Sequence, residues 1–416
     1  MKRVISWILM PFLGLPLLAL AADNTRSITA YQDAGAASGA NWLSEWKFAS
    51  GFASSSTYDD NRFIQPNNKR EGLIFSFTPE MAIGRGDYIQ ELNVVSIKQE
   101  VVEGLDDSLD GLKRDNLFFS YNPTLSLFSR EDESDTLDHN FRLATRQSAA
   151  FSAVAAQLLY QTETTSNIEI GGLTKRKNVS ATIDASYNFS EKVTVTSLGR
   201  ANRESFSNGL SSSEVRAAAA LSYRVRPKTI LGTEIAAGRL QPESGATQIF
   251  LVPSFKYDFG PVAKLRFNGS LGMDLRQFGD SAADRAYFIF DVAGRYDVSE
   301  GRSVALAARR EIRASARYTG ENLLNTTYEA RFQQRLFRRY ELTLFAGRSR
   351  DAYENNQGNP TVARHDDYYF GRIAFTRNLG RSSRVGFDYA HNQNKSSDPT
   401  FEFTRNTYSV TYAYAF

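Results

Sequence analysis

The sequence predicts an all-β chain that closes into a transmembrane, antiparallel, up-and-down β-barrel of about 18 strands, with 16 or 20 as alternatives. Three observations lead to this prediction. Apolar and polar residues alternate with period two from Trp46 to Phe416. The alternating pieces are about 11–16 residues long, which is longer than ordinary globular strands and sufficient to cross a bilayer at a tilt. Short and long connections alternate along the chain, as they do in outer-membrane barrels.

The first 44 residues divide into a leader and a polar extension. Lys2 and Arg3 precede an apolar stretch over 4–20, and the small residues Ala19 and Ala21 form a cleavage pattern. An N-terminal membrane anchor is the alternative, which the two prolines in the stretch disfavour. We expect a signal peptide over 1–21, a short periplasmic extension over 22–44 and the barrel over 45–416.

The composition excludes several classes of protein. The chain of 416 residues is 42% hydrophobic, and its mean hydropathy of -0.39 is too polar for a helical membrane protein. A barrel hides its membrane signal in the alternation, so a polar average is compatible with it. The absence of cysteine excludes disulfides and thiol chemistry. A net charge of +3, with both signs interspersed, argues against a nucleic-acid partner.

The alternation assigns residues to the two faces of each expected strand. In 262–276, Leu271 and Met273 fall on one face, and Asp274 and Arg276 fall on the other. The expected strands cover 45–58, 70–83, 88–102, 115–129, 137–161, 176–189, 192–206, 214–225, 229–239, 247–258, 262–276, 285–297, 302–315, 325–337, 340–352, 365–378, 383–395 and 402–416. The piece 137–161 is interpreted as one overlong strand, and the even count places both termini in the periplasm.

The connections fall into two sets. The tight ones, expected on the periplasmic side, are 85–87, 190–191, 226–228, 260–261, 299–301, 338–339 and 380–382. The longer polar ones, expected outside the cell, are 103–113, 164–175, 207–213, 277–283, 316–324 and 353–364. This asymmetry is typical of proteins of the bacterial outer membrane, where the chain would contact membrane lipid.

The last expected strand carries an aromatic row. Tyr408, Val410, Tyr412, Tyr414 and Phe416 share one face, which we expect to face lipid. Its terminal members Tyr412, Tyr414 and Phe416 resemble a barrel-assembly signal that the barrel-insertion machinery reads.

Charged and amide side chains occupy many positions on the opposite faces. The candidate pore-lining residues are Lys264, Arg266, Asn268, Asp274, Arg276, Asp291, Arg295, Arg309, Glu311, Arg313, Glu329, Arg331, Gln333, Arg335, Arg372 and Asp388. Arginine guanidinium groups can bind carboxylates, phosphates or sugar hydroxyls. The alternative is that these side chains hydrate the lumen and pair with acidic neighbours across strands.

Catalytic signatures are absent from the sequence. The chain has three histidines, His139, His365 and His391, and no G-x-S-x-G or H-E-x-x-H pattern. We therefore expect no enzyme, no cofactor and no resident metal. The sequence His365-Asp366-Asp367, near an expected external loop, is a weak candidate for cation binding, with solvated loop residues as the simpler interpretation.

Short motifs carry a family resemblance. Tyr58-Asp59-Asp60-Asn61 closes the first expected strand, and the blocks 186–194 and 222–230 share the pattern Ser-Tyr-x-x-[Ser/Arg]-x-Lys. Over 45–416 the chain resembles the β-barrel porins (porin 2-like) encoded with bacterial exopolysaccharide and capsule loci. The resemblance implies an outer-membrane channel that assists export of a polysaccharide polymer, together with a periplasmic polysaccharide-export protein, and it implies no catalytic residues.

A general or nutrient-uptake porin is the alternative function, because the same lumen would serve it. A long constriction loop folded into the lumen would favour uptake. No expected external loop is long enough for this role, and 353–364 is the nearest candidate.

Overall fold

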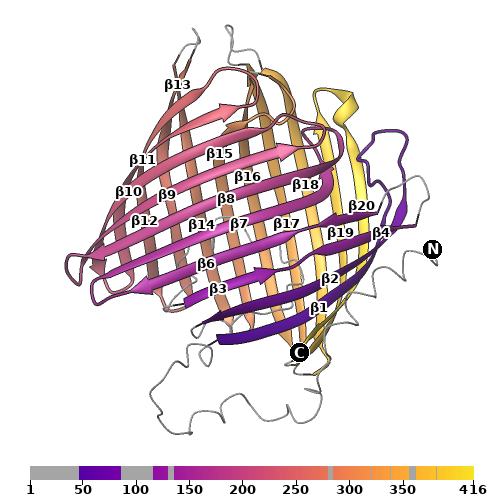
Figure 1. Ribbon diagram of the computed structural model, residues 1–416, viewed down its shortest axis with the longest axis horizontal. Coiled ribbons are helices and arrows are strands. Elements are labelled where there is room, and N and C mark those ends of the chain that lie inside the picture. The colour runs from indigo at the N-terminus through magenta and orange to yellow at the C-terminus, as the bar shows by residue number, and fades with distance from the viewer. Residues whose placement is uncertain are drawn as a thin grey trace. The chain divides into compact units, whose positions relative to one another are not determined.

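A computed structural model describes residues 46–85, 116–129, 135–279, 284–319, 321–337, 339–355, 362–380 and 382–416. Within the unit Trp46–Phe416, one antiparallel sheet closes on itself. The predicted fold is confirmed, because the strands form a closed antiparallel barrel whose wall has 18 strands. Figure 1 shows them tilted and following one another around the wall.

The wall is built from 20 strand segments. They are β1 (Trp46–Asp59), β2 (Gly72–Arg85), β3 (Asn116–Tyr121), β4 (Thr124–Phe128), β5 (Thr136–Asp138), β6 (Asn140–Ser148), β7 (Ser152–Asn167), β8 (Gly172–Asn188), β9 (Val193–Phe206), β10 (Ser212–Arg226), β11 (Thr229–Pro242), β12 (Gln248–Val262), β13 (Leu265–Phe278), β14 (Arg285–Ser299), β15 (Arg302–Ala314), β16 (Glu321–Leu336), β17 (Tyr340–Asn355), β18 (Val362–Asn378), β19 (Ser383–Ser396) and β20 (Phe403–Ala415); a short 3-10 helix, η4 (Pro399–Phe401), precedes β20.

Two wall strands are interrupted, which reduces the 20 segments to 18 strands. β2 pairs with both β3 and β4, which are separated by Asn122 and Pro123. Proline lacks the N–H that a ladder needs, so an interruption is expected there. β5 and β6 are likewise separated by a single residue, His139, and pair with β4 and β3.

The ladder closes between the two ends of the described chain. β1 pairs with β20 from Gly51 opposite Ala415 to Asp59 opposite Thr407. Closure removes the exposed edges that an open sheet would leave, and this makes a sheet compatible with the membrane interior.

One predicted strand is wrong. The piece 137–161 is two strands, because β6 ends at Ser148 and β7 begins at Ser152. The backbone N–H of Ala149 donates to the carbonyl of Ser152 at 2.7 Å and closes the turn between them. The predicted strand 88–102 lies outside the described residues, and the wall reaches 18 strands without it because β2 pairs directly with β3 and β4.

The two ends of the barrel differ in their connections. At the turn end, where β1 begins and β20 ends, the connections include the two-residue turns 227–228, 263–264 and 300–301. At the opposite, loop end, the connections are longer, and 397–402 is an example. The predicted loop 164–175 is shorter than expected, because β7 and β8 leave only 168–171 between them. The connection 86–115 and the predicted loop 103–113 within it lie outside the described residues.

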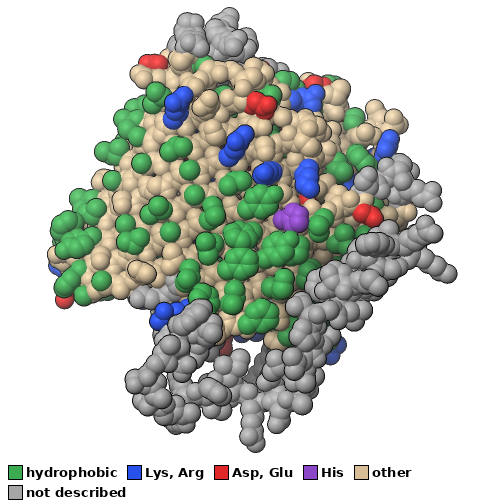
Figure 2. All heavy atoms as spheres, viewed as in Figure 1, with side chains coloured by type: hydrophobic (Ala, Val, Ile, Leu, Met, Phe, Trp, Pro, Cys, Tyr) green, Lys and Arg blue, Asp and Glu red, His purple; other side chains and the backbone are tan. Residues whose placement is uncertain are grey.

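The two faces of the wall have opposite character. On β13, Leu271, Met273 and Leu275 are exposed, whereas Asp274 and Arg276 between them are buried. Figure 2 shows hydrophobic side chains spread over the outer surface in a broad band. Among the described residues, no helix is long and apolar enough to cross a membrane. A closed ladder with an apolar outer band is the construction of a membrane-spanning β-barrel.

Candidate functional site

The predicted pore-lining residues share one face of the wall. Directly opposite residues of a ladder point to the same side, so the register connects Ser270 to Asp291 and Asp291 to Arg309. The same face contains the buried residues Asp274 and Arg276 and is turned away from the exposed apolar row. All the candidate positions follow this register except Lys264, which lies in the turn between β12 and β13.

Many of these charges are neutralised by neighbours. Arg276 donates to both carboxylate oxygens of Asp274, at 2.9 and 3.0 Å. The ion pair of Arg266 with Asp258 measures 2.6 Å, and that of Arg309 with Glu311 also measures 2.6 Å. The inner face is therefore strongly polar but carries its charges largely as compensated pairs.

Part of the wall bends into the lumen. The ladder between β14 and β15 ends at Phe290 opposite Arg310, although both strands continue beyond it. We call the described residues 311–319 and 321–324, the loop-end parts of β15 and β16 with their connection, the infolded hairpin. Asn322 in this hairpin accepts a hydrogen bond from Gln248 Nε2 at 2.7 Å. Because Gln248 belongs to β12, four strands away in the wall, this contact runs across the lumen and not along the wall.

The tip of the infolded hairpin contacts three other connections at the loop end. The Ser315 hydroxyl donates to Glu169 Oε1, in the β7–β8 turn, at 2.6 Å. The N–H of Leu210, between β9 and β10, donates to the carbonyl of Ala316 at 2.6 Å. The hydroxyls of Thr319 and Ser244, the latter between β11 and β12, lie 3.0 Å apart. The tip thus crosses the mouth of the barrel.

A hydrophobic cluster on the inner face of β10, β11 and β12 packs against the hairpin. Ala218 and Ala236 are small inward residues of β10 and β11, and they leave space beside Phe250 and Val252 of β12. Ala314 of the hairpin packs against this cluster. The two alanines leave room on the inner face of the wall. The burial of apolar surface between this face and Ala314 favours the bent position of the hairpin.

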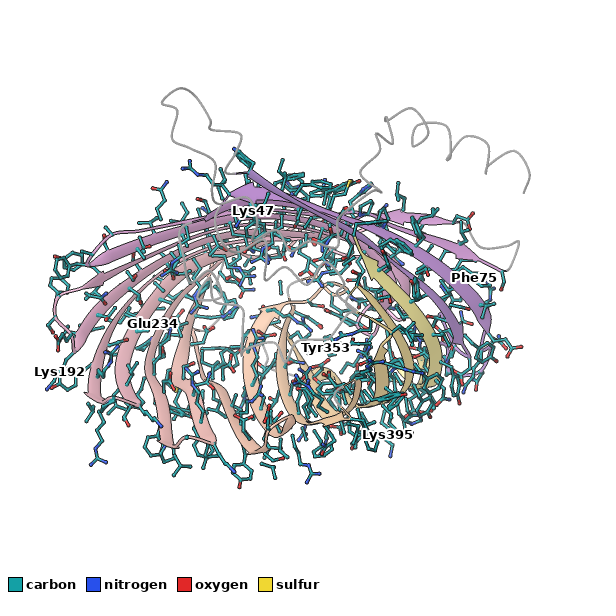
Figure 3. The ribbon with its side chains drawn as sticks, turned by 90° about the horizontal axis from the view of Figure 1, so that it is seen from below. Lys47, Phe75, Lys192, Glu234, Tyr353 and Lys395 are labelled. Atoms are coloured by element: carbon teal, nitrogen blue, oxygen red, sulfur yellow. The ribbon has the colours of Figure 1, made fainter. Side chains whose placement is uncertain are left out.

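On its other side, the hairpin faces a buried group of aromatic and charged residues. Tyr353 is fully buried, and Figure 3 shows it within the ring of strands. Arg364 Nε donates to Asp366 Oδ1 at 2.9 Å, and its guanidinium carbon lies 3.3 Å from the centre of the Phe401 ring. The Nη1 of Arg364 also donates to the carbonyl of Glu169 at 3.2 Å. These contacts fill the mouth between β18, η4 and the β7–β8 turn.

Glu169 is the ionisable group that joins these two sets of contacts. Burial raises the pKa of the Glu169 carboxyl above its usual value, although the positive charge of Arg313 and the hydrogen bond from Ser315 act in the opposite direction. The Glu169 carboxyl therefore takes up a proton at a higher pH than a carboxyl in water does.

A cavity of about 530 Å³ lies at the turn end, beside the turn 300–301. Its charged lining residues are Lys264, Arg295, Asp297, Glu300, Arg302, Arg335 and Glu341. Four of the predicted pore-lining residues, Lys264, Arg295, Gln333 and Arg335, meet here. Contacts of the hairpin therefore cross the mouth at the loop end, whereas a charged cavity lies at the turn end.

The constriction in this barrel forms without a long external loop. The narrowing is built from the ends of wall strands, and residues 353–364 contribute to it through the buried side chains of Tyr353 and Arg364. One signal in the sequence could have indicated it. The run Ile249-Phe250-Leu251-Val252 is apolar on both faces, and such a run is typical of a strand that is buried on both sides.

The candidate cation site does not assemble. Asp366 is buried on the inner face beside Arg364, whereas His365 is exposed on the other face. Asp367 pairs with Arg348 at 2.7 Å. Within the described ranges, no group of three or more metal-ligating side chains is present.

The motif Tyr58-Asp59-Asp60-Asn61 lies at the seam between β1 and β20. Asp60 accepts a hydrogen bond from the N–H of Asn406 at 2.7 Å, and the Asn61 amide donates to the carbonyl of Thr404 at 3.1 Å. Lower on the seam, the Phe52 ring lies 6.0 Å from Tyr412 and 6.2 Å from Phe416. Both the motif and the terminal aromatic row thus contribute to barrel closure.

No protein-family model matches the sequence, and no curated protein matches it. Among solved structures, the chain is similar to OccK3 (OpdO) of Pseudomonas aeruginosa, with a TM-score of 0.46, 10% identity and coverage of 89% of this chain and 96% of that chain. It is also similar to the FrpB iron transporter of Neisseria meningitidis (TM-score 0.46, 9% identity, coverage 88% and 81%) and to Pseudomonas aeruginosa OpdK with vanillate (0.44, 9%, 89% and 99%). The chain has the architecture of an outer-membrane β-barrel, and the comparisons link it to no exopolysaccharide family.

Proposed function

We propose that the protein is an outer-membrane channel for small hydrophilic solutes, of the general or nutrient-uptake type. The infolded hairpin is the observation that carries this proposal. A barrel of about 16–18 strands encloses an aqueous channel when its lumen is empty. Here the hairpin tip and the group around Arg364 occupy the loop-end mouth, which favours small solutes over a wide hydrated polymer.

The inner face supports passage of hydrated solutes. Its arginines are mostly paired with acids, as Arg266 is with Asp258 and Arg309 is with Glu311. Paired charges keep the lumen hydrated without creating a strong electrostatic potential of one sign. They therefore do not bind a charged solute so tightly that it cannot leave. In this proposal the predicted pore-lining residues face the solute path, and the cavity at the turn end receives solute after the constriction.

The proposed orientation places the loop end outside the cell and the turn end in the periplasm. The short turns support this orientation, since short periplasmic turns are usual in bacterial barrels. Removal of 1–21 as a signal peptide, and recognition of Tyr412, Tyr414 and Phe416 by the insertion machinery, belong to the same proposal.

Solute uptake into proteoliposomes tests the function. We expect vesicles that contain the purified chain to admit small sugars, amino acids and organic acids, and to exclude polyethylene glycols as their size rises. Empty vesicles are the control. Passage of long dextrans through the intact chain, or no uptake of any small solute, would contradict the proposal.

Polysaccharide export, with a periplasmic export protein as partner, is a second candidate. The resemblance around Tyr58-Asp59-Asp60-Asn61 favours it, although these residues also close the seam. Deletion of the gene separates the two candidates. Loss of extracellular polymer with normal solute uptake supports export, and the reverse result supports the solute channel.

A further inference from the structure

The outer face of β8–β11 carries a group of cations near the loop end. We call this group the basic edge; its members are Lys175, Lys177, Arg203 and Arg239, all of them exposed. The ladders place Arg203 opposite Val179 on β8 and Arg239 opposite Val215 on β10. The four side chains therefore share the outward face near the loop end, on β8, β9 and β11.

The basic edge borders the apolar band directly. Moving toward the turn end, the next outward residues after Lys177, Arg203 and Arg239 are Val179, Ala201 and Ala237. Figure 2 shows Lys and Arg side chains along the loop-end border of the hydrophobic band. This is the depth at which lipid headgroups meet acyl chains.

On the outward rows of β8–β11, all of them described, cations lie only toward the loop end. At the turn-end border of the same strands, the outward residues are Tyr187, Val193 and Tyr223. Within the described part of the chain, none of the four cations forms an ion pair. The acid near Arg203 is Glu243, whose carboxylate accepts a hydrogen bond from the N–H of Ser211 at 2.7 Å.

We infer that the basic edge binds the phosphate groups of membrane lipids in the leaflet at the loop end. Lys and Arg pair strongly with phosphate oxygens, and their alkyl stems can lie along apolar surface while their charged ends reach the headgroups. Lys177 has this arrangement, because its Nζ lies 5.4 Å from the centre of the outward Tyr160 ring. A ligand that joins a phosphate to acyl chains matches both the cations and the apolar band below them.

Native mass spectrometry of the full chain in detergent tests this inference. The probes are a bis-phosphorylated glycolipid, its dephosphorylated form and inorganic phosphate. We expect the phosphorylated lipid to bind at least tenfold more tightly than the dephosphorylated one, since each cation at a membrane surface contributes measurably. Replacing Lys175, Lys177, Arg203 and Arg239 with Gln should abolish this difference.

The control removes two exposed cations at the other end, as Lys192→Gln with Lys228→Gln, and is compared with the two-site variant Lys175→Gln with Lys177→Gln. The control should keep the tenfold preference. Equal lipid affinity in the four-site variant would overturn the inference. An equal loss in the control would do so as well, because it would reduce the effect to net charge. Tight binding of inorganic phosphate in place of the lipid would assign the site to a free anion.

A separate observation concerns the unzipped ladder between β14 and β15. Pairing stops at Phe290 opposite Arg310, yet continuing the same register would place Phe288 opposite Ile312 and Ala286 opposite Ala314. Phe288 is an exposed outward residue. Ile312 and Ala314 are apolar, so the alternation of the hairpin already matches a position in the wall.

We propose that the infolded hairpin has a second position, zipped to β14, in which the mouth is wider. The infolded position is stabilised by the Ser315–Glu169 hydrogen bond and by the apolar cluster around Ala314. The zipped position would replace these contacts with backbone ladder bonds between 286–289 and 311–314. Such an exchange between two nearly balanced sets of contacts is the usual basis of a two-state element. This proposal deepens the channel function, because it names the device that regulates it.

Cysteine crosslinking tests the second position without measuring transport, and the chain has no cysteine of its own to interfere. Phe288→Cys with Ile312→Cys should form a disulfide only when the hairpin zips. The control pair Phe290→Cys with Arg310→Cys lies in the existing ladder and should crosslink quickly. Slow but complete crosslinking of the first pair supports the proposal, and no crosslinking while the control reacts would overturn it.

The disulfide between positions 288 and 312 should also raise the channel conductance several-fold, and reduction should reverse the rise. Unchanged conductance would show that the motion of the hairpin does not gate the channel.

Discussion

The guanidinium of Arg405, near the start of the last strand, donates hydrogen bonds to the carboxylate of Asp59, at the end of the first strand. Arg405 Nε lies 3.0 Å and Nη2 lies 2.6 Å from Asp59 Oδ2, and Asp59 is fully buried. The pair joins residues 346 positions apart and fixes the register at which the barrel closes. A buried ion pair of this kind contributes more to the choice of strand register than to the net free energy of folding.

Loss of one partner of this pair should destabilise the barrel. Arg405→Ala leaves the Asp59 carboxylate buried without its counter-charge, and we expect a loss of about 3 kcal/mol in the free energy of unfolding. Urea unfolding in lipid vesicles measures it. The control is Arg295→Ala, whose pair with Asp297 is about half exposed and should be worth less than about 1 kcal/mol. Equal losses in the two variants would contradict the role of the seam.

Acidification should favour the infolded position of the hairpin. The pKa of Glu169 is raised when it is buried against the hairpin tip, so the infolded state binds a proton more readily than a state with Glu169 in water. The infolded state is therefore stabilised as pH falls through the raised pKa, and it loses this stabilisation as pH rises. The ionisable groups that face Glu169 are Arg313 on β15, Glu321 on β16, Asp351 and Tyr353 on β17, and Arg364 on β18.

Conductance between pH 7 and pH 5 measures this effect, and we expect it to fall with acidification. Glu169→Gln imitates the protonated carboxyl and should conduct at the lower level across the range. A conductance that rises on acidification, or a Glu169→Gln channel that keeps the full pH dependence, would show that Glu169 is not the responsible group.

A charge placed in the apolar cluster should release the hairpin. Val252 is buried behind the hairpin, so Val252→Asp would bury an unpaired carboxylate in the infolded state and favour the wider mouth. Single-channel recording should show a several-fold rise in conductance. Ser254→Asp is the matched control, because Ser254 is two residues along the same face of β12 and outside the cluster. A similar rise in both variants would show that the cluster is not what holds the hairpin.

Two arginines on one face of β13 should respond differently to charge reversal. Arg266 is largely exposed, so Arg266→Glu should leave conductance similar and shift ion selectivity toward cations, because two acids then face each other with Asp258. Arg276 is buried and donates to Asp274, Gln248 and the carbonyl of Ile312. Arg276→Glu should therefore disturb the hairpin and change conductance. Reversal potentials in a salt gradient distinguish the two, and unchanged selectivity in Arg266→Glu would place that side chain outside the ion path.

The sequence predicted the barrel well because strand alternation is a local property. It failed at 137–161 because apolar residues continue in phase across a turn that exchanges the two faces. Leu143 faces outward on β6, whereas Leu159, also an odd-numbered apolar residue, faces inward on β7, where Val154 and Leu158 are exposed instead. The infolding was not predictable for a different reason. Residues 311–314 alternate like any wall strand, and their bent position depends on distant partners such as Ala236 and Glu169.

The single-channel conductance of a trimmed barrel tests the central claim most directly. Replacing residues 311–325 with an Asn-Gly turn joins Arg310 to Thr326, which already pair across β15 and β16, so the strand register is kept. The β14–β15 ladder ends at Arg310 and stays intact, so the wall stays closed. If the infolded hairpin narrows the channel, the trimmed barrel should conduct several-fold more than the intact one and admit larger polyethylene glycols. A trimmed barrel that folds and conducts like the intact chain would contradict the account.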